Sequence, residues 1–386
     1  MSVRMSDGAW ELDQEHEDFR ASVRAFVDRH VRPVVEESER AGRPPAGLLK
    51  EMGTAGLLGL AVPAQYGGGD GDALAATLLA EELARASGGI AVTALVSGYM
   101  STPHIARFGT DAQRARYLPG LASGDQIGAI AVTEPGTGSN VAGITTRATP
   151  VDGGYRLDGT KMFITNAGIA DVFVVAARTS PDRHRGITTF IVEAGTPGLS
   201  TGQPLRKMGW HASDTREVIL DGCVVREDAV LGTVNRGFHQ IMTAFQLERL
   251  NLAGMGLGHA AECLAAATAY AREREVFGAP LMSLQTMRHR LAALSVELEA
   301  AQLLTYRAAA RLDAGHPKAA ESVAKAKYHA AIAANRIVDE CVQVFGGSGF
   351  LDETPVARHY RDARVLRIGG GTDEIQLEIL AKGLQA

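Results

Sequence analysis

The chain has 386 residues, of which 46% are hydrophobic and 22% charged, and its formal net charge is −5. This length accommodates two or three domains, and the composition is typical of a soluble globular protein. Lysines and arginines are interspersed with acidic residues, as in ARERE at 271–275. No basic stripe therefore indicates a nucleic-acid partner.

Cysteine usage and the N-terminal segment exclude further classes. Cys223, Cys263 and Cys341 are too few and too widely spaced for a disulfide framework or a metal site, so we expect reduced, mostly buried thiols. The N-terminal stretch MSVRMSDGAWELDQEHEDF is acidic where a signal peptide is first basic and then apolar. No apolar run is long enough to span a membrane, and we expect a cytoplasmic protein with no membrane partner.

Residues 1–125 are predicted to form an all-α domain. Asp13 and Asp72 are plausible N-caps, and ALAATLLAEELARAS is an amphipathic helical run. Prolines at 33, 44 and 45 and the stretch YGGGDGD mark the connections.

Residues 126–236 have a different character. The segments GAIAVT, KMFIT, DVFVVAART and REVILDGCVV are short and rich in β-formers, and turns such as VDGG and GTPG separate them. The pattern predicts a compact antiparallel barrel or sandwich. Long helical segments return over 237–386 and predict a C-terminal four-helix bundle, which gives an α+β chain overall.

Two glycine-rich stretches are candidate ligand loops. TEPGTGS at 133–139 follows an apolar strand, but it has neither the GxGxxG spacing of a dinucleotide fold nor the GK ending of a P-loop. Alone, an ordinary turn is the better interpretation. IGGGTDEIQ at 368–376 runs into a helix that Thr372 or Asp373 can cap. Its glycines permit close approach to a ligand, and its helix N-terminus offers free N–H groups.

A single carboxylate interrupts an apolar helical stripe at 241–260. Steps of three or four residues place Ile241, Phe245, Glu248, Leu252 and Met255 on one face. No Lys or Arg lies three or four residues from Glu248, and the adjacent Arg249 is expected to point to a different face. The alternative to a catalytic carboxylate is a buried glutamate paired with a distant residue.

Several motifs in fixed order carry a resemblance to a known family. TEPGTGSNVAG, KMFITN, the REVFG that begins at Arg274, QVFGGSGF and GGTDEIQ follow one another along the chain. In this respect the chain resembles the acyl-CoA dehydrogenases over essentially its whole length. The resemblance implies two helical domains flanking a β-domain, assembled as a homotetramer, a dimer of dimers, with FAD near a subunit interface.

The resemblance also assigns cofactor contacts. The Thr165 hydroxyl is expected near the reactive part of the flavin, and Arg274, Phe277 and Gln285 near the adenosine diphosphate of a neighbouring subunit's FAD. Without the family, strand core would be the better interpretation of Phe163 and Ile164, and a surface charge that of Arg274. The complete expected FAD set is Ala131, Val132, Thr133, Gly138, Ser139, Phe163, Ile164, Thr165, Arg274, Phe277, Gln285, Gln343, Gly346, Gly347, Thr372, Asp373 and Glu374.

The catalytic base is the main question of the sequence. Many family members carry a carboxylate two residues before the Thr of the final loop, where this chain has Gly370. The isovaleryl-CoA and long-chain types instead carry the base in an ER pair on a helix, together with a glycine in that loop. By this resemblance Glu248 is the base, with Asp373 or Glu374 as the next candidates, and the Gly370 N–H binds the thioester carbonyl. The expected substrate contacts are Ser139, Gln246, Arg249, Gly370 and Gly371.

The expected reaction is α,β-dehydrogenation of an acyl-CoA or acyl-carrier-protein thioester to the trans-2-enoyl thioester. Glu248 would remove the α-proton, the β-hydrogen would pass to the flavin as hydride, and an electron-transfer flavoprotein would accept the electrons. One alternative is a flavin oxidase or monooxygenase that uses O2 on the same fold. Another is a non-catalytic flavin-binding module. The length and branching of the acyl chain are not predicted.

Overall fold

The first third of the chain is helical. The structure is a computed structural model that describes residues 12–384. The side chain of Asp13 accepts a hydrogen bond from the His16 N–H at 2.9 Å, and that of Asp72 accepts one from Ala75 at 2.8 Å, so both predicted N-caps are confirmed. The helices of this part are α1 (Gln14–Phe26), α2 (Val35–Ala41), α3 (Leu48–Thr54), α4 (Ala73–Ala86), α5 (Gly88–Leu95), α6 (Thr102–Phe108) and α7 (Asp111–Ser123).

The central part is a twisted sheet whose strands follow the order β6-β7-β3-β2-β4-β5-β8, with β1 paired to β4. Strand β4 pairs in parallel with both β1 and β2, whereas the other strand pairs of this sheet are antiparallel. The prediction of a purely antiparallel sheet was therefore wrong at β4. Alternate residues of the strands, such as Phe173 and Val175, are buried in the core of the sheet. The strands are β1 (Gly128–Ala131), β2 (Arg147–Val151), β3 (Gly154–Thr165), β4 (Val172–Arg178), β5 (Ile187–Glu193), β6 (Leu199–Thr201), β7 (Thr215–Arg226) and β8 (Val230–Leu231).

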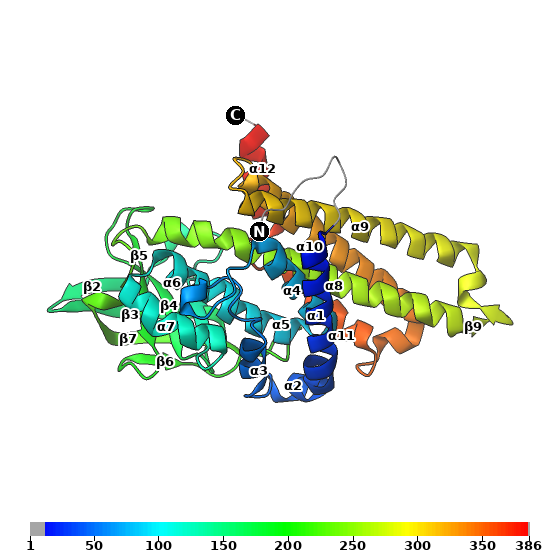
Figure 1. Cartoon of the computed structure of the whole chain (residues 1–386), viewed down its shortest axis with the longest axis horizontal. Coiled ribbons are helices and arrows are strands. Elements are labelled where there is room, and N and C mark those ends of the chain that lie inside the picture. Colours follow the sequence, from blue (N-terminus) through cyan, green and yellow to red (C-terminus); the bar gives the residue numbers. More distant parts are fainter. Residues whose placement is uncertain (1–11, 385–386) are drawn as a thin grey trace.

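Long helices dominate the last part and extend away from the sheet (Figure 1). Helix α8 packs closely on α4 because Gly258 has no side chain: a Cβ there would lie 2.1 Å from the Glu81 carbonyl oxygen. The expected succession of helical, sheet and helical parts is confirmed. The elements are α8 (Gly237–Glu273), β9 (Glu275–Val276), β10 (Ala279–Pro280), α9 (Gln285–Asp313), α10 (Ala319–Phe345), α11 (Pro355–Ala363) and α12 (Asp373–Leu384).

The three cysteines are buried and free, as predicted. Within residues 12–384, no helix is long and apolar enough to cross a membrane. Residues 1–11 begin the acidic segment for which no signal peptide is predicted, and they lie outside the described residues.

A buried histidine joins the N-termini of α1 and α4. His16 is 2% exposed and contacts Asp13 at 2.7 Å and Asp72 at 3.1 Å. Its pKa is raised to about 9, mainly by the hydrogen bond to Asp72. Because the folded pKa is raised, the stabilisation is fully present below the unfolded value near 6.5 and is lost as the pH rises through about 9.

We therefore expect His16→Gln to lower the free energy of unfolding by about 1–3 kcal/mol at pH 6 and by much less at pH 9.5. Urea unfolding at both pH values measures the difference. His316→Gln, at an exposed histidine, is the control. An equal loss at both pH values would show that the imidazolium is not the stabilising species.

Candidate active site

Strand β3 carries an irregularity at Phe163. Its pairing with β7 shifts register between Lys161 and Ile164, and Phe163 has φ +61°. A left-handed backbone costs a residue other than glycine about 1–2 kcal/mol. Here the bulge turns the Phe163 ring outward, 65% exposed, while Ile164 stays buried at 3%. The strand-core interpretation therefore describes Ile164 and not Phe163.

The loop after β1 lies directly against this bulge. The Met162 N–H donates to the Thr133 carbonyl at 2.9 Å. Thr133 and Thr165 are partly exposed, and among residues 12–384 neither hydroxyl has a protein hydrogen-bond partner. A Cβ on Gly138 would meet open space, and Ser139 is exposed. Residues 133–139 and the bulge at Phe163 thus form an open surface, called the ledge below, where two hydroxyl groups without a partner in the described chain lie beside an exposed aromatic ring.

A buried ion pair fixes that ledge. Lys161 is 0% and Glu134 is 4% exposed, and the Lys161 ammonium donates to Glu134 at 2.8 Å and to the Val132 carbonyl at 3.1 Å. Glu134 also accepts N–H groups from Thr145 and Thr146. The sequence interpretation missed this pair, although both residues lie in the quoted motifs. The signal in the sequence was Lys161, a charged residue within the β-prone segment KMFIT.

Burial acts on both charges of this pair. It would raise the pKa of Glu134, but the Lys161 charge and the donated hydrogen bonds outweigh it and hold that pKa at about 2. Burial lowers the pKa of Lys161 to about 8, and the Glu134 charge opposes the shift. The pair is therefore ionised at neutral pH.

The ledge meets α8 through a small hydrophobic cluster. Val132 belongs to the same cluster as Ile241, and Phe245 packs against it. Because Phe245 lies one turn before Glu248, the cluster places the predicted base close to the loop after β1. Gln246 lies on the same turn, and within the described residues its Oε1 is buried without a protein partner. Ala131, which precedes Val132 at the end of β1, is fully buried in the sheet.

Glu248 is an unpaired carboxylate. It is partly exposed, and within residues 12–384 it makes no salt bridge or hydrogen bond to protein. Its pKa is raised to about 7 by burial, which the charges of Arg249 and Lys327 oppose. Because no residue within 12–384 pairs directly with Glu248, the alternative of a structural buried ion pair has no support.

Gly370 lies beside Glu248. A Cβ on Gly370 would be 3.7 Å from the Glu248 Oε1 and 2.5 Å from the Leu252 Cδ1. Gly370 and Gly371 have φ +64° and +97°, which a residue with a side chain adopts only under strain. The Thr372 hydroxyl accepts the Ile375 N–H at 3.4 Å and so caps α12, as predicted.

The carbonyls of this glycine turn are held by three side chains. Arg249 Nε donates to the Gly370 carbonyl at 3.1 Å, and Lys327 Nζ to the Gly371 carbonyl at 2.5 Å. The Gln376 amide donates to both. Within residues 12–384 the N–H groups of Gly370 and Gly371 have no protein acceptor. Arg249 was expected to point away from the face of Glu248, but the turn brings both residues to Gly370.

The two second-choice bases have other contacts. Asp373 is 7% exposed and accepts a hydrogen bond from Arg367 at 2.6 Å. Glu374 is exposed, and a hydrogen bond with Thr372 lowers the pKa of its carboxyl. Both carboxylates therefore have hydrogen-bond partners, whereas that of Glu248 has none within residues 12–384.

The remaining predicted cofactor residues gather at the other end of the long helices. Arg274 is the C-cap of α8, 26 residues after Glu248, which is about 39 Å along a helix. Phe277 is fully exposed between β9 and β10. Figure 1 shows β9 at the far end of the long helices, away from the sheet. Tyr270 stacks on Phe345 at 4.4 Å and brings the end of α10 to this place. This second group is exposed and comprises Arg274, Phe277, Gln285, Gln343, Gly346 and Gly347.

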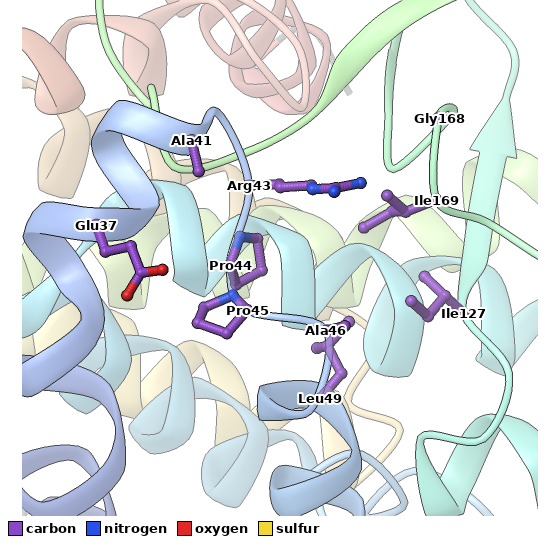
Figure 2. Close-up of a pocket in the computed structure, with 10 residues that line it drawn as sticks. All are labelled: Glu37, Ala41, Arg43, Pro44, Pro45, Ala46, Leu49, Ile127, Gly168 and Ile169. Atoms are coloured by element: carbon purple, nitrogen blue, oxygen red, sulfur yellow. The ribbon is translucent and has the colours of Figure 1, made fainter.

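A pocket of about 520 Å³ lies between the α2–α3 connection and the β-domain (Figure 2). Arg43 extends across it toward Ile169, and Glu37 stands at the other side. None of the predicted site residues lines this pocket.

Comparison with known proteins identifies the family. Three family models match in order: acyl-CoA dehydrogenase N-terminal domain over residues 13–125, middle domain over 129–223 and C-terminal domain over 235–385. The chain belongs to the acyl-CoA dehydrogenase family, whose members are oxidoreductases that act on CH–CH groups.

Individual relatives agree over nearly full length. An acyl-CoA dehydrogenase of Bacillus subtilis (strain 168) is 39% identical, with 97% of this chain and 98% of the relative covered. Butyryl-CoA dehydrogenase from Megasphaera elsdenii has a TM-score of 0.94 at 37% identity, covering 98% and 100%. A glutaryl-CoA dehydrogenase from Mycobacterium smegmatis in complex with FADH2 has a TM-score of 0.91 at 34% identity, covering 97% and 95%.

The buried pair of the ledge generates a prediction. Lys161→Met leaves the Glu134 charge buried without its partner, and we expect the free energy of unfolding to fall by about 3–5 kcal/mol. Urea unfolding measures it. The control is Lys50→Met, which breaks a lysine–aspartate pair at the exposed Asp125 and should have little effect. Equal effects of the two variants would contradict the prediction.

Proposed function

We propose that this chain catalyses FAD-dependent α,β-dehydrogenation of an acyl thioester of CoA or of an acyl-carrier protein, giving the trans-2-enoyl thioester. The observation that carries the proposal is the Glu248 carboxylate beside a glycine turn: within the described residues neither the carboxylate nor the N–H groups of the turn have a protein partner. A base and an oxyanion donor at one place suit the removal of a proton α to a carbonyl.

Glu248 accepts the α-proton. Its apolar surroundings raise its pKa toward neutrality, which makes it a stronger base than an exposed glutamate while part of it remains ionised. The Gly370 N–H donates to the thioester carbonyl, where negative charge develops as the proton leaves. Because other groups hold the carbonyls of the turn, this donor is fixed before substrate binds.

FAD, when bound, accepts the β-hydrogen as hydride. The residues of the ledge fit such a group, because Thr133 and Thr165 offer hydroxyls that no group of residues 12–384 occupies for the polar edge of a flavin, and Phe163 offers an exposed ring. Gly138 leaves room for close approach. The solved relative that contains FADH2 supports this cofactor.

The division of the cofactor residues into two groups supports a homo-oligomer. A separation of about 39 Å along α8 keeps Arg274 and Phe277 from the ledge of their own chain. A second copy whose hairpin reaches that ledge would complete the site, as in a homotetramer built as a dimer of dimers. Arginine suits the pyrophosphate of FAD because its planar fork donates paired hydrogen bonds.

The proposed electron acceptor is an electron-transfer flavoprotein. Stopped-flow reoxidation of the reduced protein in air discriminates this from an oxidase or monooxygenase. Slow reoxidation that an electron-transfer flavoprotein accelerates is the expected result. Rapid reoxidation by O2 alone would overturn this acceptor.

The central prediction concerns Glu248→Gln, which preserves volume and removes basicity. We expect it to fold and to bind FAD and acyl-CoA, yet to reduce flavin at least ~100-fold more slowly. In the parent, the rate of flavin reduction should rise with pH around a midpoint near 7, because only the ionised carboxylate accepts a proton. Anaerobic stopped-flow with a panel of short, branched and long acyl-CoAs measures both.

A relocation experiment tests the geometry. Glu248→Gly removes the base, and Gly370→Glu supplies a carboxylate at the neighbouring position. Since a side chain at 370 would meet Leu252 at 2.5 Å, Leu252→Ala is added to make room. Partial recovery relative to Glu248→Gly with Leu252→Ala would show that both positions reach one α-carbon. Near-parental flavin reduction by Glu248→Gln would refute the assignment of the base.

A further prediction concerns Arg274. Its loss removes a charge-assisted donor worth about 1.5–3 kcal/mol, so Arg274→Ala should bind FAD about 10- to 150-fold more weakly. The flavin-to-protein ratio after gel filtration and FAD titration of the apoprotein measure this. Arg272→Ala, at an exposed arginine on the last turn of α8, is the matched control. Unchanged affinity in Arg274→Ala would refute the pyrophosphate contact.

A further inference from the structure

Two lysines of the described chain rank among its largest fully buried side chains, Lys161 and Lys327. Lys161 has the Glu134 carboxylate as its partner at 2.8 Å. Lys327, on α10, is 1% exposed, and within residues 12–384 no carboxylate oxygen lies within salt-bridge distance of it. Its ammonium donates a hydrogen bond to the Gly371 carbonyl at 2.5 Å. Lys327 is therefore a buried ammonium bonded to the glycine turn, with no contacting carboxylate among the described residues.

Packing alone does not account for a lysine at this position. Burying an ammonium without a carboxylate is costly, and burial lowers the pKa of Lys327 to about 8 despite the opposing charge of Asp373. Its neighbours along the buried face of α10, Val323, Ala330 and Ala331, are small or apolar. An apolar side chain would fill the same space at lower cost. The charge and the hydrogen bond are what lysine adds.

The geometry connects this ammonium with the proposed base. Gly371, which accepts the Lys327 hydrogen bond, follows Gly370, whose absent side chain would contact Glu248. The charged groups around Glu248 are Arg249 on its own helix and Lys327 on α10. Arg249 is held by the Gly370 carbonyl at 3.1 Å.

Two more charges face Lys327 from the segment that leads into α12. They are Arg367 and Asp373, which pair with one another at 2.6 Å. Since these two largely neutralise one another, Lys327 remains a net positive charge near Glu248.

We propose that Lys327 is a positioning residue for the reaction: it fixes the Gly371 carbonyl so that the Gly370 N–H faces the thioester, and its ammonium favours the ionised form of Glu248. The second half rests on Glu248 being the base of the proposed function. The first half concerns the glycine turn and holds whatever thioester is bound.

The test compares Lys327→Met with Lys327→Arg. Methionine has an unbranched side chain of similar length without the charge, whereas arginine keeps a cation and a hydrogen-bond donor. Lys325→Met is the matched control, since Lys325 is exposed two residues earlier on the same helix and pairs with Glu321. All variants are compared as FAD-loaded holoproteins with equal flavin content. Lys327→Arg and the control should behave like the parent if the charge is what acts.

The first readout is independent of turnover. Infrared difference titration follows the protonated carboxyl band of Glu248, identified by its absence in Glu248→Gln. Removing a nearby cation should move the titration midpoint of Glu248 upward by about one pH unit in Lys327→Met. Amide hydrogen exchange of the peptide covering 368–376 should become faster in the same variant. An unchanged midpoint or unchanged exchange would overturn the proposal.

The second readout is the pH dependence of flavin reduction. In Lys327→Met the midpoint should move upward with the infrared value, and at pH 6 the rate should fall about tenfold more than at pH 9. A uniform decrease at every pH would show a merely structural effect and overturn the proposal. If none of the acyl-CoAs reduces the flavin of the parent protein, the proposed function fails. The infrared and hydrogen-exchange results still decide the role of Lys327 in that case.

Discussion

The structure around the site depends on one constraint: a carboxylate in apolar surroundings must remain without a direct partner. A salt bridge within contact distance would stabilise the ionised Glu248 and make it a weak base, whereas complete isolation would keep it protonated. The chain meets the constraint by holding two cations, Arg249 and Lys327, close enough to act through space but bonded to backbone carbonyls. The raised pKa near 7 is the balance of burial against these charges.

The same use of buried charge recurs in the sheet, with the opposite outcome. Lys161 and Glu134 are in direct contact, so both stay ionised and the loop after β1 is fixed to β3. There the charges stabilise the structure, and in the described part of the chain the nearby Thr133 and Thr165 hydroxyls have no partner. Lys161 and Lys327 are buried to a similar extent. A contacting carboxylate therefore makes Lys161 part of a structural ion pair, whereas Lys327, which lacks one, acts on Glu248 through its electrostatic field.

Features set by local chemistry could be predicted from the sequence. The caps at Asp13 and Asp72, the cap at Thr372 and the solitary carboxylate on an apolar stripe follow from short-range spacing. The parallel pairing of β1 with β4 and the bulge at Phe163 could not, because strand register depends on contacts distant in sequence. The contact of Arg249 with Gly370 was missed for the same reason: helical periodicity gives a direction around one helix but no information about a turn 121 residues away.

Steric coupling explains why the proposed base and the glycine turn belong together. With Glu248 on α8, the turn must pass so close that a Cβ at 370 would collide with Leu252, and its φ of +64° excludes most side chains. A carboxylate on the turn would instead require a smaller residue at 252 and a relaxed backbone. Adding a carboxylate at position 370 while Glu248 remains would place two carboxylates in contact. Removing Glu248 while Gly370 remains would leave none. The position of the proposed base is thus tied to at least three residues together, and a glycine at 370 points to a carboxylate on the helix only when Leu252 and the cations that hold the turn are considered with it.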